Sequence, residues 1–205
     1  LEVAGDYYDV IALRDGRIAF AVGDVSGKGA GAALIMANLQ AALRALCGVE
    51  LPVKEIVARI NEMIFASTDA EQYITFFVGI YEPRDGTFTY VNAGHNAPLL
   101  RRADGCIETL TAGGTVLGVF DDSSYRQETL VLAPQDVLLI YTDGLSEALS
   151  RSEEEFGEER IHALMREAEG VAAQEIMERL IMQVSRFRAA EIPEDDMTLL
   201  VVRVL

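Results

Sequence analysis

The chain has 205 residues, half of them hydrophobic, and 33 acidic against 17 basic side chains give it a formal net charge of −16. A chain of this length and apolar content can bury one substantial core, so a single domain over residues 1–205 is expected. The negative charge would repel the phosphate backbone of DNA or RNA and argues against a nucleic-acid partner. The apolar runs are too short to span a bilayer and the first ten residues lack a signal-peptide pattern, so we expect a cytoplasmic domain without membrane contact.

The first third of the chain predicts a hairpin followed by two helices. Residues 7–13 and 18–22 have strand character and flank the turn sequence Arg14-Asp15-Gly16-Arg17. Residues 29–46 are rich in alanine and leucine at helical spacing, and Pro52 opens a second apolar stripe that continues to residue 67. We expect these two helices to pair. Because the chain opens inside a strand-like segment without a methionine, we also expect it to be an N-terminally truncated fragment of a longer regulatory protein.

The remainder of the chain predicts a sheet-rich middle and a helix before the last strand. Ile176, Leu180 and Val184 share one face of that helix, and the near-continuous apolar character of residues 197–205 indicates a strand buried on both faces. Short strands punctuated by turn residues are expected at 73–81, 87–92, 99–102, 106–110, 125–132 and 137–141. The pattern favours an α+β fold: a four-layer α/β/β/α sandwich in which two stacked, mostly antiparallel sheets are flanked by helix pairs.

Aspartates follow or precede several of these strands. Asp24 follows the second strand, Asp143 follows the strand at 137–141, and Asp195 comes just before the last strand. Carboxylates that converge at strand ends raise one another's pKa unless a countercharge is present. Lys28 is a single positive charge among them, so a bound divalent metal is the simpler explanation. Oxygen ligands of this kind suit Mg²⁺ or Mn²⁺ rather than zinc.

The order of five motifs carries a family resemblance over nearly the whole chain. The chain resembles the SpoIIE-like (RsbU-type) branch of the PPM, or type 2C, metal-dependent serine/threonine protein phosphatases. The resemblance rests on Gly-Asp-Tyr-Tyr-Asp at 5–9, Gly-Asp-Val-Ser-Gly-Lys-Gly at 23–29, Asn-Ala-Gly-His-Asn-Ala-Pro at 92–98, Tyr-Thr-Asp-Gly at 141–144 and Asp-Asp-Met-Thr at 195–198.

The resemblance implies two divalent cations, Mn²⁺ or Mg²⁺, and a role for each aspartate. Asp24 would bridge the two metals, Asp143 and Asp195 would complete one site, and Asp6 with the backbone carbonyl of Val25 would serve the other. Asp24 and Asp143 would be the catalytic residues. The resemblance further assigns accessory positions to two more aspartates, Asp9 and Asp196. A water activated by the metals would then attack phosphorus in line, without a phosphoenzyme.

The resemblance also implies partners. The substrate would be a phosphorylated protein, of the anti-anti-sigma-factor kind in bacterial partner-switching signalling. Because the first helix directly follows Asp24, we hypothesise that an upstream regulatory domain repositions the helix pair. Dimerisation through these helices is a separate hypothesis. No arginine precedes Asp6, where eukaryotic relatives use one to grip the phosphate, so phosphate binding would rest on the metals alone.

The same residues allow alternative functions. His95 could be a general acid, but a hydrogen-bonded structural histidine is favoured, and Ser26 lacks a neighbouring histidine to activate it as a nucleophile. A catalytically weak or inactive domain of the same fold, acting as a regulatory binding module, is the main alternative. A calcium-binding module lacks EF-hand spacing, and Gly27-Lys28-Gly29 is not the phosphate loop of a kinase.

Overall fold

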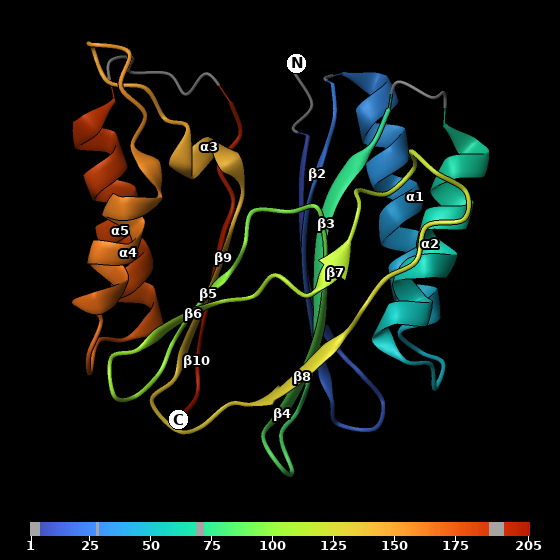
Figure 1. Cartoon of the computed structure of the whole chain (residues 1–205), viewed down its shortest axis with the longest axis horizontal. Helices are drawn as coiled ribbons and strands as arrows, with labels where there is room; N and C mark the ends of the chain where they lie inside the picture. The colour runs from blue at the N-terminus through green and yellow to red at the C-terminus, as the bar shows by residue number, and fades with distance from the viewer. Residues whose placement is uncertain (1–4, 28, 69–71, 189–194) are drawn as a thin grey trace. The chain divides into compact units, whose positions relative to one another are not determined.

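The computed structural model describes residues 5–27, 29–68, 72–188 and 195–205. The chain divides into two compact units: unit 1 comprises Leu1–His95 and Thr111–Val131, and unit 2 comprises Asn96–Leu110 and Leu132–Leu205. Each unit has its own sheet and its own helices, which confirms the predicted α+β class (Figure 1). In the described part of the chain, no helix is both long and apolar enough to cross a membrane.

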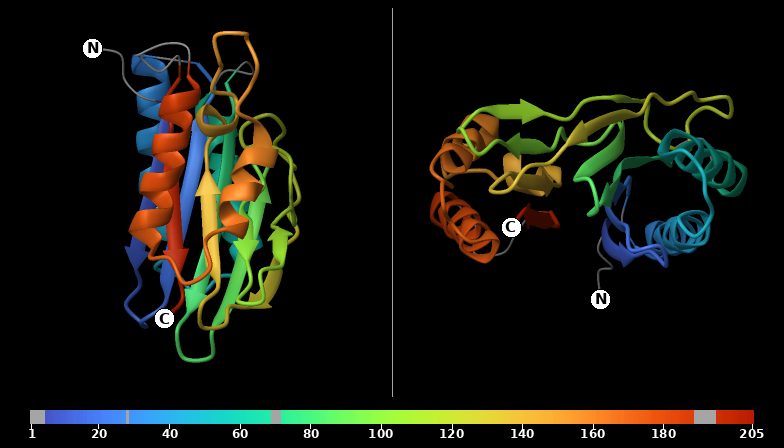
Figure 2. Two further views of the ribbon diagram at one scale, coloured as in Figure 1. Left: turned by 90° about the vertical axis from the view of Figure 1, so that its left-hand side faces the viewer. Right: turned by 90° about the horizontal axis from the view of Figure 1, so that it is seen from below.

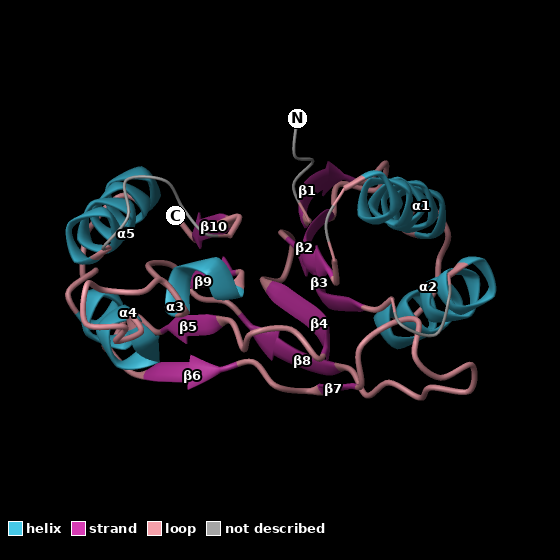
Figure 3. Ribbon diagram, turned by 90° about the horizontal axis from the view of Figure 1, so that it is seen from above, coloured by secondary structure: helices cyan, strands magenta, loops and turns pink. Residues whose placement is uncertain are grey.

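Unit 1 is a six-stranded sheet with two helices on one face (Figures 1 and 3). The predicted hairpin and helix pair are confirmed, and neighbouring strands along β1, β2, β3 and β4 pair antiparallel. The elements are β1 (Asp6–Ala12), β2 (Ile18–Val25), α1 (Ala30–Leu46), α2 (Val53–Ser67), β3 (Ile74–Glu82), β4 (Thr87–Ala93), β7 (Gly113–Gly114) and β8 (Glu128–Val131).

The two faces of the unit 1 sheet carry different side chains. Tyr7, Ala21 and Phe76 belong to the core that includes buried residues of α1 and α2, so their side chains face the helices. Because side chains alternate along a strand, their neighbours in sequence point to the opposite face, here called the far face. Phe77 and Tyr90 stack on this far face with ring centroids 5.6 Å apart.

Unit 2 is a four-stranded sheet in the order β10-β9-β5-β6, with α4 and α5 on one face (Figures 2 and 3). Leu180 and Val184 of α5 are fully buried, as the helical spacing of the sequence predicts. The elements are β5 (Leu99–Arg101), β6 (Ile107–Thr109), β9 (Val137–Tyr141), α3 (Asp143–Ser146), α4 (Gly157–Arg166), α5 (Ala173–Phe187) and β10 (Leu199–Arg203).

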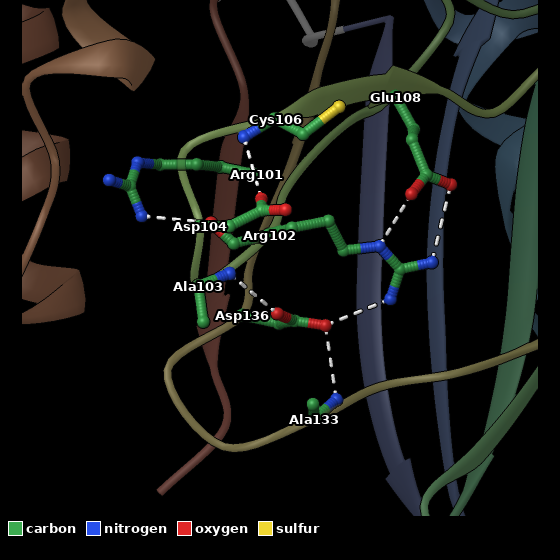
Figure 4. A network of polar contacts seen from close by, with 8 residues as sticks. All are labelled: Arg101, Arg102, Ala103, Asp104, Cys106, Glu108, Ala133 and Asp136. Atoms are coloured by element: carbon green, nitrogen blue, oxygen red, sulfur yellow. Dashed lines mark hydrogen bonds and ion pairs between the residues drawn. The ribbon is translucent and has the colours of Figure 1, made fainter.

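A buried carboxylate holds two turns of unit 2 together (Figure 4). Asp136, only 1% exposed, accepts hydrogen bonds from the backbone N–H groups of Ala103 and Ala133, both at 3.0 Å. It also pairs with Arg102 at 2.9 Å, and Arg102 in turn binds Glu108 on β6. The β5–β6 hairpin is therefore tied to the turn that leads into β9.

Two strands differ from the sequence prediction. Residues 199–203 form β10 at the edge of the unit 2 sheet and are half-buried throughout, so the prediction of burial on both faces is wrong. An edge strand keeps one side of its backbone without a neighbouring strand, however apolar its side chains are. Gly113 and Gly114, which lie between the strands expected at 106–110 and 125–132, form the short β7, which pairs parallel with β4.

The Asp-Gly turns behave as turn residues. Asp15, Asp85 and Asp104 each accept a hydrogen bond from the backbone N–H two residues later. The glycines that follow all have φ between 74° and 94°, a conformation that favours glycine. These three aspartates thus have a structural role that needs no bound ion.

Candidate functional site

Unit 1 places two of the predicted ligands beside each other. Asp6 on β1 and Asp24 on β2 are directly opposite in the antiparallel register, so their side chains share a face of the sheet with Cβ atoms about 5 Å apart. Their neighbours Tyr7 and Val25 belong to the helix-side core, which puts both carboxylates on the far face. Both aspartates are half-buried. Two like charges at this separation call for a countercharge.

The Val25 carbonyl oxygen and the Asp24 carboxylate both lie beside Gly5. The Val25 N–H donates to the Gly5 carbonyl at 3.1 Å, which extends the β1–β2 pairing by one step. A Cβ added to Gly5 would lie 3.1 Å from Asp24 Oδ1 and 3.2 Å from the Val25 carbonyl oxygen. The absence of a side chain at Gly5 therefore leaves space beside these two oxygens.

The loop after Asp24 is anchored by Ser26. Its N–H donates to the Tyr73 carbonyl at 2.9 Å, and its hydroxyl accepts from the Tyr73 N–H at 2.8 Å. Gly27 and Gly29 have φ of 88° and 91°, so they serve the turn into α1, and added Cβ atoms there would meet nothing within 4 Å. Lys28 lies outside the described residues. Ser26 is thus a loop anchor, in line with the prediction that it is not a nucleophile.

Asp9 is placed away from this group. It lies three residues after Asp6 in β1, so its side chain points to the helix face. There it is 7% exposed, and its two carboxylate oxygens bind Arg44 of α1 at 2.8 and 2.7 Å. It also accepts from the Tyr7 hydroxyl at 2.9 Å. Arg44 of α1 thus balances the charge of Asp9 on the helix face, and the accessory role of Asp9 stays a prediction.

Unit 2 brings Asp143 and the segment around Asp195 together. Asp143 begins α3 and is separated from the end of β9 by one residue. That residue, Thr142, makes two hydrogen bonds with Thr198: its N–H donates to the Thr198 carbonyl at 3.1 Å, and its hydroxyl accepts from the Thr198 N–H at 2.9 Å. A Cβ on Gly144 would lie 1.9 Å from the Asp196 carbonyl oxygen. Gly144 therefore permits a close approach that no other residue type would allow.

The electrostatics of unit 2 indicate a cluster of like charges. Burial, and after it the negative charge of Asp195, raise the pKa of Asp143 above its ordinary value of 3.8. Burial and then the charge of Asp143 raise the pKa of Glu147. The sequence analysis does not include Glu147. Asp143 begins the short helix α3 and Glu147 follows four residues later, so the spacing places both on one side of the helix. Asp196 is half-buried beside Asp195, and its accessory role stays a prediction.

The residues in both units fit hard divalent cations in donor type. Every candidate ligand is an oxygen, as Mg²⁺ and Mn²⁺ prefer. Two carboxylates are neighbours in the unit 1 sheet, and in unit 2 the charge of Asp195 raises the pKa of Asp143. Within the described residues, no group of three or more His, Cys, Asp or Glu side chains is arranged to hold a metal ion. Mg²⁺ commonly takes only one or two carboxylates and keeps several waters, so pairs of aspartates with a backbone carbonyl are compatible with it.

His95 is a buried, hydrogen-bonded residue of unit 1. It is 6% exposed, and its Nδ1 lies 2.9 Å from the Thr75 hydroxyl. Its backbone N–H and carbonyl both bind the side chain of Asn92. This environment supports the structural histidine preferred in the sequence analysis over a general acid.

The comparisons with known proteins decide the family. The sequence model of the family Stage II sporulation protein E (SpoIIE) matches residues 14–205. The chain belongs to the SpoIIE family. The resemblance read from the five motifs is thereby confirmed.

Relatives and solved structures agree with this family. Phosphoserine phosphatase RsbU from Bacillus subtilis is 29% identical over 204 residues, covering 98% of this chain and 60% of RsbU. The PP2C phosphatase domain of SpoIIE from Bacillus subtilis, solved with a fragment of its regulatory domain, matches with a TM-score of 0.80 and 25% identity over 98% of this chain and 59% of that one. RsbX, solved in complex with magnesium, shares the fold with a TM-score of 0.72 at 20% identity over 97% of this chain and 86% of that one.

The chain is shorter than its curated relatives. It spans 60% of the length of RsbU and 36% of Protein IcfG from Synechocystis sp., to which it is 26% identical. The matched region covers 98% of this chain in both cases.

Proposed function

We propose that the chain hydrolyses phosphoserine or phosphothreonine on a protein substrate with the help of Mn²⁺ or Mg²⁺. The observation that carries the proposal is the placement of family-motif aspartates in pairs, Asp6 with Asp24 in unit 1 and Asp143 with Asp195 in unit 2. The name of RsbU, a phosphoserine phosphatase, supports the reaction, and the magnesium complex of RsbX supports the cofactor.

The proposed ligands follow from this placement. Asp6, Asp24 and the carbonyl of Val25 form the ligand group of unit 1, and Asp143 with Asp195 forms that of unit 2. When bound, two divalent cations lower the pKa of a coordinated water toward neutrality and neutralise the phosphoryl oxygens. The protein's part is to fix the carboxylate and carbonyl oxygens in place, and the bound cations would keep the carboxylates deprotonated.

The residues around the ligands support hydrolysis by water rather than by a side-chain nucleophile. Ser26, the nearest hydroxyl in sequence to Asp24, accepts the Tyr73 N–H, and no histidine is hydrogen-bonded to it among the described contacts. Gly5 and Gly144 keep the carboxylates accessible and the backbone close, because a methyl group at either position would crowd the ligand oxygens or the chain beside them. A phosphoenzyme intermediate is therefore not part of the proposal.

The substrate belongs to the same proposal. We infer a phosphorylated protein of the anti-anti-sigma-factor type, in a partner-switching pathway, as the family resemblance of the five motifs implies. The name of RsbU supports a phosphoserine substrate. An upstream domain that acts on the α1–α2 pair is proposed as the regulator, since α1 begins five residues after Val25 and a shift of α1 would move the end of β2. Equal metal affinity and turnover in the isolated domain and the full-length protein, with and without the signal, would argue against this regulation.

The proposal is tested by hydrolysis of p-nitrophenyl phosphate and of a phosphoserine peptide with Mn²⁺, Mg²⁺ or EDTA. We expect metal-dependent turnover that falls at least about 100-fold in Asp24→Asn and in Asp143→Asn, because each change removes a ligand charge from one unit. Asp85→Asn is the matched control: it makes the same carboxylate-to-amide change in an exposed turn of unit 1 and should leave turnover unchanged.

The other outcomes separate the competing functions. Metal binding without turnover, in the isolated domain and in the full-length protein alike, would favour the alternative of a regulatory binding module with the same fold. A chain that binds neither Mn²⁺ nor Mg²⁺ would rule out the proposed function.

A further inference from the structure

A row of polar side chains crosses one end of the unit 1 sheet. Asp6 is opposite Asp24 in the β1–β2 register, and Asp24 is opposite Thr75 in the β2–β3 register. Directly opposite residues of an antiparallel pair point to the same face. Thr75 therefore lies next to Asp24 on the far face, on the side away from Asp6.

The Thr75 hydroxyl is tied to a buried histidine. Thr75 is half-buried, and its Oγ1 lies 2.9 Å from Nδ1 of His95, which is 6% exposed. A threonine side chain has few accessible χ1 rotamers, and a hydrogen bond to a buried partner selects one of them. The methyl and hydroxyl groups that Thr75 presents to Asp24 are thus fixed by His95.

The turn that follows β4 fixes the position of His95. The Asn92 side chain accepts from the His95 N–H at 2.7 Å and donates to the His95 carbonyl at 3.0 Å. Gly94 has a φ of +69°, and a Cβ there would lie 2.5 Å from Cγ1 of Val116, so the turn has little freedom to change shape. The Asn92 hydrogen bonds and the tight turn at Gly94 fix the backbone of His95, and this backbone sets the position from which the imidazole reaches Thr75.

We propose that His95 is a positioning residue that acts through Thr75 on the metal-binding end of β2. By fixing Thr75, it limits the space and the rotamers available to the Asp24 carboxylate, so that Asp24 is preorganised for a cation. The inference rests on the proposed function in one respect, namely that Asp24 is a metal ligand. Groups that orient a metal ligand from behind it are worth about 10- to 100-fold in metal affinity.

The test measures Mn²⁺ binding by titration calorimetry together with the melting temperature of the metal-free chain. Thr75→Val keeps the branched shape and removes only the hydroxyl, and we expect it to weaken Mn²⁺ binding about 10-fold or more. Thr75→Ser keeps the hydroxyl and should restore binding close to that of the unchanged chain. Thr89→Val is the matched control, because it removes a hydroxyl that pairs with Thr129 elsewhere on the same sheet.

Variants of the histidine test the direction of the effect. His95→Phe should weaken Mn²⁺ binding as much as Thr75→Val, and combining the two should cause no further loss, since both changes break the same link. His95→Asn places an amide near the position of Nδ1 and should recover part of the affinity.

The outcomes separate this inference from the proposed function. If the unchanged chain binds Mn²⁺ and Thr75→Val binds it equally well, the positioning role is overturned while the proposed function stands. If Thr75→Val and Thr75→Ser lose affinity and melting temperature alike, the loss does not depend on the hydroxyl and the inference fails. If the unchanged chain does not bind Mn²⁺, the proposed function falls first and the positioning role falls with it.

Discussion

Asp6 and Asp9 show how one strand gives two aspartates of the same motif unrelated roles. They are three residues apart in β1, and the alternation of side chains sends them to opposite faces of the sheet. Asp6 meets Asp24 on the far face, and Asp9 meets Arg44 and Tyr7 on the helix face. Burial, and then the hydrogen bond to Asp9, raise the pKa of Tyr7, which keeps its hydroxyl a donor.

Replacing Asp9 separates these roles experimentally. We expect Asp9→Asn to lower the free energy of unfolding by about 1–3 kcal/mol, because hydrogen bonds to a buried carboxylate are lost. Mn²⁺ affinity should not change, since the carboxylate is bound to α1. Urea denaturation measures the free energy of unfolding, and calorimetry measures the Mn²⁺ affinity. Asp15→Asn is the control, because Asp15 forms an exposed ion pair with Arg17. A large loss of Mn²⁺ affinity at unchanged stability would instead support the accessory role of Asp9.

Sequence reasoning at the residue scale reached the aspartates through their motifs and strand ends. It could not assign a face to Asp9, because the strand at 7–13 alternates in a way that leaves both faces partly polar. It missed Glu147, whose effect depends on burial and on the neighbouring charge of Asp143. Neither quantity is visible in a local pattern.

At the scale of elements, Asp136 links the turn before β9 to the β5–β6 hairpin, where its partners Ala103 and Arg102 lie 33 and 34 residues earlier in the chain. Its carboxylate accepts from Arg102, Ala103 and Ala133 at 2.9–3.0 Å. An asparagine has one acceptor oxygen where the carboxylate has two, and its amide would face donors. We expect Asp136→Asn to cost about 3 kcal/mol of unfolding free energy.

Hydrogen exchange locates the effect of that change. Amides of β5 and β6 should exchange faster in Asp136→Asn, because the hairpin loses its tie to the turn before β9. The control Asp104→Asn lies in the exposed turn of the same hairpin and accepts a single backbone N–H, so it should change stability by no more than about 0.5 kcal/mol. Equal effects of the two changes on unfolding free energy and on amide exchange would show that Asp136 stabilises the hairpin no more than Asp104 does.

The elements themselves were largely predictable, and the exceptions have physical causes. Helical periodicity located α1 and α2 within a residue and identified the buried face of α5, since each helix has an apolar stripe that packs on a sheet. The burial of β10 was overestimated because an apolar sequence does not reveal whether a strand lies at an edge. The parallel pairing of β7 escaped detection because two glycines carry no periodicity.

At the scale of the whole molecule, the excess of 33 acidic over 17 basic side chains makes stability depend on protons and cations. In unit 2 the pKa of Asp143 is raised by burial and by Asp195. A carboxyl group whose folded pKa lies above its unfolded value stabilises the fold most when protonated. Its contribution is present below the ordinary value of 3.8 and is lost as the pH rises through the raised folded pKa.

The stability of the metal-free chain should therefore carry a component from Asp143 that declines with rising pH. We expect the difference in unfolding free energy between Asp143→Asn and the unchanged chain, measured by urea denaturation in EDTA, to shift in favour of Asp143→Asn as the pH increases from about 4 to 7. With Mn²⁺ the direction should reverse for the unchanged chain alone, because a cation binds the deprotonated carboxylate and so stabilises the fold more at higher pH. If the pH curves of both chains are parallel in EDTA, the pKa of Asp143 is not raised in the folded chain. If they are parallel with Mn²⁺, Asp143 is not a ligand of the metal.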